Sequence, residues 1–276
     1  PQLKVQGRFD FIGTALIVGA LTCLNVGLGA NLEFSSAGSF EDLSPLPDYA
    51  FPVLITGGLL FLGFLLVESR VKDPLINLSM FKRKNLALAS IVNILVGYAL
   101  FIGLVSVPIL VNIRQENLES LREAALQVGL LLSTLTVPMA VAAVPGGWLS
   151  DRIGIRNTVV IGIVLSLLGF VAIWNSWQID IPDMIIAVQM ATVGIGIGLT
   201  FSPVSAAIIN SATESERGVA SALVIILRLI GMTISVSSLT TYGLYRVNQL
   251  AILAQQEPGF DTSTFINVYA DSTVQV

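Results

Sequence analysis

The chain has 276 residues, of which 54% are hydrophobic and 12% are charged, and its formal net charge is -4. Soluble globular domains have about 25% charged residues, so water is not the solvent for most of this chain. The acidic balance excludes a nucleic-acid-binding surface, and the absence of histidine removes the commonest general base and metal ligand, so we expect no enzyme, no metal site and no cofactor.

Apolar stretches of about 20 residues recur along the chain, and a helix of that length crosses the hydrocarbon core of a bilayer. The stretches are apolar on every side instead of alternating, which favours helices over barrel strands. Seven membrane helices are predicted, at residues 9–30, 49–67, 86–112, 123–144, 158–174, 184–209 and 218–242. The predicted fold is therefore an all-α bundle of membrane helices.

Two segments outside these helices are long. Residues 31–48 are rich in Ser, Gly and Pro and show no periodicity, so they are interpreted as a connector. Residues 243–276 are polar and contain no apolar run that would complete an even number of spans. Because the chain also begins at Pro1 without a signal-type segment, we expect an incomplete protein whose sequence starts internally.

Basic residues are distributed unequally between the two sides of the predicted bundle. The side of the N-terminus holds ten: Lys4, Arg8, Arg70, Lys72, Lys82, Arg83, Lys84, Arg152, Arg156 and Arg217. The opposite side holds three: Arg114, Arg122 and Arg246. The positive-inside rule then predicts a cytoplasmic N-terminus and, after seven spans, a C-terminal tail outside the cell membrane.

Four polar side chains fall within predicted spans: Asn93, Tyr98, Gln189 and Thr200. Each has two interpretations. A polar residue in a membrane helix either lines a substrate cavity or forms a hydrogen bond between helices, and the second is the commoner case.

The segment Gly146–Asn157, with the sequence GGWLSDRIGIRN, joins two predicted spans. Gly147 permits close approach of helices, and Asp151 is expected near a helix N-terminus, where the dipole favours its charge. Arg152 and Arg156 are expected to pair with Asp151 or with lipid phosphates. A tight positive-inside turn is the simpler alternative, and it accounts for the arginines but not for the whole string.

The next span contains Gly194, Gly196 and Gly198, followed by Pro203. The glycines permit either tight helix packing or bending, and Pro203 leaves the carbonyl of Leu199 without its usual donor, so the helix is a candidate for a kink.

Arg228 is the one ionisable residue near the middle of a predicted span. A charge there costs at least about 2.5 kcal/mol on insertion scales, so the side chain must face protein or water. It is either a substrate, proton-linked or gating contact, or an anchor between helices. No Asp or Glu lies mid-span, so any coupling carboxylate is expected in a missing part of the protein.

The string from Gly147 to Arg156 resembles the G-x-L-x-D-R-x-G-x-[RK] loop motif of the major facilitator superfamily. The resemblance implies a conformational latch made by Gly147, Leu149, Asp151, Arg152, Gly154 and Arg156. Within that family, residues 70–81, the run Gly194–Gly198 with Pro203, Arg217-Gly218 and Arg228–Gly231 look like the fourteen-helix drug:proton antiporters. On this resemblance residues 1–85 contain two central linker helices, residues 86–242 the first five helices of the C-terminal half, and residues 243–276 an outer loop or tail.

The function implied by this resemblance is proton-coupled export of drugs or amphipathic small molecules by alternating access, with the lipid bilayer, a small-molecule substrate and protons as partners. Arg228, Asn93, Tyr98 and Gln189 are the candidate pathway or coupling residues, and Gly194, Gly198 and Pro203 the candidate bending positions. The alternatives are an exporter of another small solute, such as a metabolite or siderophore, and a seven-helix receptor. The receptor is suggested by span count alone, and no span contains the Lys that a retinal protein requires.

Overall fold

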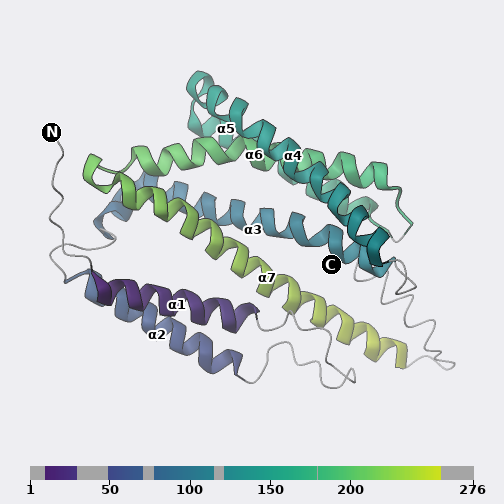
Figure 1. Ribbon diagram of the computed structural model, residues 1–276, viewed down its shortest axis with the longest axis horizontal. Helices are drawn as coiled ribbons and strands as arrows, with labels where there is room; N and C mark the ends of the chain where they lie inside the picture. The colour runs from purple at the N-terminus through teal and green to yellow at the C-terminus, as the bar shows by residue number, and fades with distance from the viewer. Residues whose placement is uncertain (1–9, 30–48, 71–77, 115–120, 179, 256–276) are drawn as a thin grey trace.

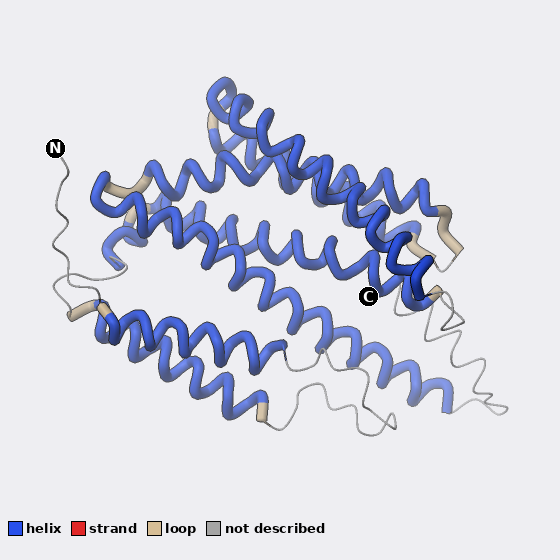
Figure 2. Tube along the Cα trace, in the orientation of Figure 1, coloured by secondary structure: helices blue, strands red, loops and turns tan. Residues whose placement is uncertain are grey.

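The computed structural model describes residues 10–29, 49–70, 78–114, 121–178 and 180–255. Its helices are α1 (Phe11–Gly29), α2 (Ala50–Glu68), α3 (Lys84–Ile113), α4 (Leu121–Ile153), α5 (Ile155–Ser176), α6 (Asp183–Asn210) and α7 (Arg217–Gln255), with short 3₁₀ segments at η3 (Leu78–Lys82) and η5 (Glu214–Glu216). Figure 2 shows helices and loops, and no strand, among these residues. The predicted all-α fold is confirmed.

The helices have the length and surface of membrane spans. Within the described residues, six are long and apolar enough to cross a bilayer, and α1 contributes a shorter apolar stretch, Phe11–Leu24. Large apolar side chains also point outward, such as Leu130 and Val144, which are 71% and 77% exposed. A continuous apolar exterior is unfavourable in water and suits contact with lipid.

The five helices α3 to α7 form one packed unit around α6. Helix α6 packs between α4 and α5 and also contacts α3, while α3 packs along α7. Helices α1 and α2 lie side by side and reach this unit through the contact of α1 with α7 (Figure 1). The α4–α5 and α6–α7 turns lie at one end of the unit, called here the α4–α5 end, and the α5–α6 connection lies at the other, the α5–α6 end.

The segment before α3, which includes η3 and Arg83, packs against the α4–α5 end of the unit. Met80 in η3 is 1% exposed and packs with Val204, Ile208 and Leu223 of α6 and α7. The Nη1 of Arg83 donates to the carbonyl of Ser211, the C-cap residue of α6. A cation at that position is also favoured by the dipole of α6.

Glycines set the close packing of α6. A Cβ on Gly194 or Gly198 would overlap the backbone carbonyl of Leu135 or Met139 on α4, and one on Gly196 would overlap Ser166 on α5. Helix α6 continues through Pro203 without ending. These contacts correspond to the packing interpretation of the glycine run.

Two helices extend beyond their predicted ends. Helix α7 continues to Gln255, although the prediction ends it at residue 242, and its 39 residues give a length of about 58 Å, against about 30 Å for a hydrocarbon core. Helix α4 continues to Ile153 instead of ending at residue 144. Both predictions used hydropathy, which detects where a helix leaves the membrane and not where its backbone hydrogen bonds stop. The predicted connector 31–48 and residues 256–276 lie outside the described residues.

Candidate functional site

Arg228 of α7 lies where three helices meet, in the middle of the apolar stretch Arg217–Val236. Its Cζ is 4.0 Å from the ring centroid of Phe201 on α6. Its Nη2 donates to the Oδ1 of Asn93 on α3 at 3.3 Å. Nε is buried, and in the described part of the chain it has no hydrogen-bond partner and no carboxylate pairs with the guanidinium. The cation is therefore held by an aromatic face and a neutral amide.

Asn93 is fixed in an orientation that serves Arg228. The side chain is 0% exposed, and its Nδ2 donates to the carbonyl of Val224 on α7 at 2.6 Å. With the amide nitrogen committed to that carbonyl, Oδ1 faces the guanidinium. Asn93 was interpreted either as lining a cavity or as forming a hydrogen bond between helices. In the structure it forms such a hydrogen bond, between α3 and α7.

The close approach of α3 and α7 places these groups within reach of each other. A Cβ on Gly97 would overlap the carbonyl of Arg228, and a Cβ on Gly231 would overlap the carbonyl of Ile94. The two backbones therefore touch directly beside Arg228, as small residues permit in membrane helices.

The same helix pair carries further polar groups. The Tyr98 hydroxyl and the Ser238 Oγ are 2.8 Å apart, so Tyr98 also links α3 to α7. The Oγ atoms of Ser90 and Ser235 are buried and have no partner among the described residues. Polar groups within the membrane thus concentrate along the α3–α7 contact, which contains three of the four candidate pathway residues.

Gln189, the fourth candidate, lies elsewhere. Its Oε1 accepts from the Trp177 Nε1 at 2.7 Å, and its Nε2 donates to the Ser176 Oγ at 2.6 Å. These contacts join α6 to the last turn of α5, at the α5–α6 end. Gln189 is therefore a link between those two helices and does not meet Arg228.

The predicted latch residues form a helical joint and not a loop. Gly154, with φ at 88°, is the one residue between α4 and α5. Asp151, which was expected near a helix N-terminus, lies in the last turn of α4, three residues before the N-cap of α5. Helix α4 runs through Pro145, Gly146 and Gly147, and the two glycines pack tightly on α6. A Cβ on Gly146 would lie 2.7 Å from the carbonyl oxygen of Leu199, and one on Gly147 2.9 Å from the Ser202 Oγ.

Side chains at this joint point mostly outward. Leu149 is half-buried, whereas Asp151, Arg152 and Arg156 are exposed, and no ion pair joins these three within the described residues. The guanidinium of Arg152 stacks on the Trp148 ring at 4.2 Å instead. The Asp151 carboxylate is thus exposed between the C-terminus of α4 and the N-terminus of α5.

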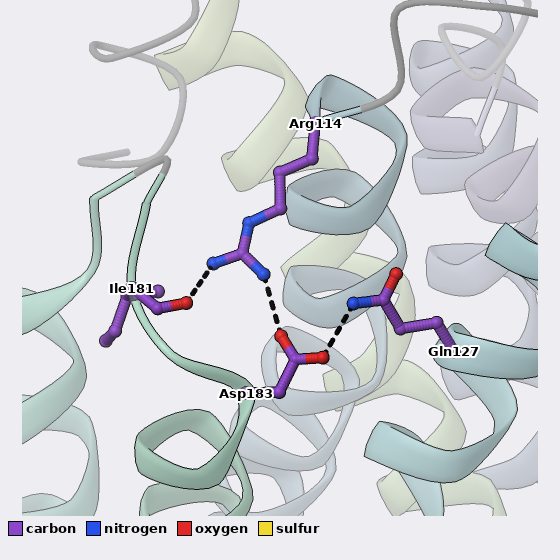
Figure 3. A network of polar contacts seen from close by, with 4 residues as sticks. All are labelled: Arg114, Gln127, Ile181 and Asp183. Atoms are coloured by element: carbon purple, nitrogen blue, oxygen red, sulfur yellow. Dashed lines mark hydrogen bonds and ion pairs between the residues drawn. The ribbon is translucent and has the colours of Figure 1, made fainter.

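Sequence reasoning missed a polar network at the α5–α6 end (Figure 3). The Asp183 carboxylate accepts from Arg114 Nη1 at 2.9 Å and from Gln127 Nε2 at 2.7 Å, and Arg114 Nη2 donates to the carbonyl of Ile181 at 2.6 Å. The network ties α3, α4 and α6 together. The available signal was the opposite charge of Arg114 and Asp183 at span ends on the same predicted side.

An open groove of about 420 Å³ lies between α4 and α6, lined by Ser133, Thr134, Val137, Pro138, Ala187, Val188 and Ala191. The hydroxyls of Ser133 and Thr134 donate to carbonyls of their own helix, so the groove presents almost no free polar group. Within the described residues, no cluster of Cys, Asp and Glu is placed to bind a metal ion.

Comparisons with known proteins agree over most of the chain. The family model described as Major Facilitator Superfamily matches residues 86–246. The chain is 32% identical over 267 residues to the triacylglyceride transporter of Mycobacteroides abscessus, covering 91% of this chain and 48% of that protein. It is 30% identical over 269 residues to the triacylglyceride transporter of Mycolicibacterium smegmatis, covering 94% and 46%. For the triacylglyceride transporter of Mycobacterium tuberculosis the identity is 28% over 257 residues, covering 88% and 46%. The chain spans about half the length of these relatives.

Proposed function

The chain belongs to the major facilitator superfamily, and on that basis we propose that it is part of a secondary transporter that moves lipid-like or amphipathic molecules across a membrane by alternating access. In this proposal α1 and α2 are the linker helices of residues 1–85. Helices α3 to α7 are the first five helices of the C-terminal half, and the packing of these five around α6 supports that division.

The relatives support an acyl lipid as the substrate. All three are named triacylglyceride transporters, and the similarity to the first extends over 91% of this chain, so it reaches into the region before residue 86 that the family model does not cover. This breadth of similarity is the observation that carries the proposal. The apolar exterior gives a molecule dissolved in the bilayer access to the protein from the side.

Proton-coupled drug export is the second candidate. It is favoured by the resemblance of residues 70–81 and of the Gly194–Gly198 run with Pro203 to drug:proton antiporters. The two candidates share fold and mechanism and differ in substrate, so a direct comparison of substrates separates them.

We further propose that the protein is a multi-pass protein of the plasma membrane, with its N-terminus and the α4–α5 end in the cytoplasm. The support is the excess of Lys and Arg on that side of the bundle, ten against three.

The α4–α5 joint is proposed to act as a latch. Asp151 is exposed and forms no ion pair within the described residues, so it gains stability from any donor-rich partner, such as a helix N-terminus or arginine elsewhere in the full-length protein. The packing of Gly146 and Gly147 on α6 holds the joint in a fixed position for that contact. If the Asp151 contact forms in one state of the alternating-access cycle and is lost in the other, it shifts the equilibrium toward the state in which it forms.

The test uses cells that express the full-length protein, the Asp151→Asn variant, or neither. Export of a fluorescent acylglycerol and of a cationic dye is measured with and without a protonophore. We expect protein-dependent export of the acylglycerol that the protonophore stops and that Asp151→Asn reduces. Export of the dye alone would select drug export, and export of neither, with the protein present in the membrane, would contradict both candidates.

A further inference from the structure

We propose that Arg228 binds the anionic head group of an amphiphilic substrate, a carboxylate or phosphate attached to an acyl chain. This inference rests on the proposed transport function and adds a charge preference that the names of the relatives do not contain. It concerns the α3–α6–α7 site built from Arg228, Asn93 and Phe201.

Within the described residues, the charge of Arg228 is stabilised but not neutralised. Its contacts are the ring of Phe201 and the Oδ1 of Asn93, and both partners are neutral. A guanidinium has five N–H donors, and one of them is used by Asn93, while the buried Nε has no partner among the described residues. The site therefore retains both charge and hydrogen-bonding capacity for an acceptor that approaches Nη1 from the partly exposed side.

The neutral partners of Arg228, Phe201 and Asn93, suit a site that binds and releases an anion in each transport cycle. An arginine with a permanent carboxylate partner loses that partner only at a large energetic cost in a low-dielectric region. The cation–π contact with Phe201 and the hydrogen bond to the Asn93 oxygen instead hold the guanidinium in position when no anion is bound. Neither contact competes with an incoming anion. In the described part of the chain, no carboxylate occupies this role.

The surroundings select an amphiphile. The residues beside Arg228 belong to an apolar cluster that includes Leu223, Val224 and Leu227 of α7 with Val92 and Ile94 of α3. On the proposed function the ligand enters from the bilayer, so it brings apolar surface with its anion to this mid-span cation. A cationic drug is repelled at this position, and a neutral ester accepts a hydrogen bond but leaves the charge uncompensated.

The test measures binding to the purified full-length protein in lipid nanodiscs at about pH 8, where a carboxylic acid is ionised. Three probes share one fluorescent acyl chain and differ in head group: a fatty acid, the matching alkyl phosphate and the methyl ester of the acid. We expect the wild-type protein to bind at least one of the two anions about tenfold more tightly than the ester. The relative affinities of the two anions show whether the site takes a carboxylate or a phosphate.

Variants test whether Arg228 causes the preference for an anion over the ester. Arg228→Gln should remove it while leaving affinity for the ester unchanged, and Arg228→Lys should retain part of it. Arg217→Gln, which removes the same charge from the first residue of α7, is the matched control and should bind like the wild type. If Arg228→Gln does not fold, Phe201→Leu, which removes the stacking partner, should weaken anion binding in its place.

Equal wild-type binding of acid, phosphate and ester would overturn the inference, and so would an anion preference that survives Arg228→Gln. Loss of the preference without loss of acylglycerol export would leave the proposed function intact. An Arg228-dependent preference in a protein that exports neither lipid nor dye would instead refute the proposed function and not the site.

Discussion

Asn93 and Arg228 illustrate how a polar group is made tolerable inside a membrane bundle. Asn93 donates an N–H to the carbonyl of Val224, and its oxygen accepts from Arg228, so a single buried amide links α3 to α7 and supports one cation. Neither role is apparent from the sequence, because the register between α3 and α7 is set by the contact of Gly97 and Gly231 with the opposite backbones.

Replacing Asn93 with Leu, a side chain of similar size, removes both hydrogen bonds while keeping most of the volume. We expect the free energy of unfolding of the full-length protein to fall by about 1–3 kcal/mol, because Arg228 loses an acceptor in a buried position. Thermal unfolding in detergent measures the change. Asn175→Leu is the control, since Asn175 is exposed and bonds within its own helix, and an equal loss in both variants would refute the account.

Gly194 tests the packing interpretation of the glycine run. Gly194→Ala should lower the free energy of unfolding by about 1–3 kcal/mol, because the new Cβ overlaps the Leu135 backbone on α4. Gly129→Ala in α4 has open space around its Cβ and should be neutral or stabilising by up to about 1 kcal/mol. The comparison uses unfolding midpoints of the two variants, and a harmless Gly194→Ala would favour bending over packing.

At the scale of helices, the polar network of Arg114, Asp183 and Gln127 ties three helix ends together. Arg114 is 17% exposed and Asp183 is 48% exposed, so solvent screens the pair and its contribution is small. The network still connects α3, α4 and α6 at the α5–α6 end, because Gln127 belongs to α4, Asp183 begins α6 and Arg114 directly follows α3 (Figure 3).

Asp183→Asn should therefore cost about 0.2–1 kcal/mol, and raising the salt concentration should reduce the difference from the wild type. A double-mutant cycle with Arg114→Gln measures the coupling of the pair. The exposed neighbour Asp180 provides the control, and Asp180→Asn should show no coupling to Arg114. Coupling that is absent for Asp183, or the same for Asp180, would contradict the network.

The sequence predicts helices better than it predicts their ends and contacts. Runs of apolar residues locate each of the seven α-helices that the structure describes, because lipid requires about 20 apolar residues per crossing. The α4 end at Ile153 and the α7 end at Gln255 depend on where backbone hydrogen bonding stops, which hydropathy does not report. The cluster of Asn93, Phe201 and Arg228 depends on three inter-helix registers, and a single sequence contains none of them directly.

At the scale of the whole molecule, α7 connects the parts of the chain. It contacts the linker helix α1, packs along α3 and carries Arg228 against Phe201 of α6. The segment before α3 is fastened to the same unit through Met80 and Arg83. We therefore expect the linker pair and the five-helix unit to move together when the full-length protein changes state.

The central claim is that the full-length protein moves acyl lipids across a membrane. It is tested most directly in vesicles that contain the purified protein, by following a fluorescent acylglycerol between the two leaflets after a pH gradient is imposed. We predict movement that requires both protein and gradient and that falls strongly in Asp151→Asn. Movement that is equal in protein-free vesicles, or unchanged when the gradient is collapsed and Asp151 is replaced, would contradict the account.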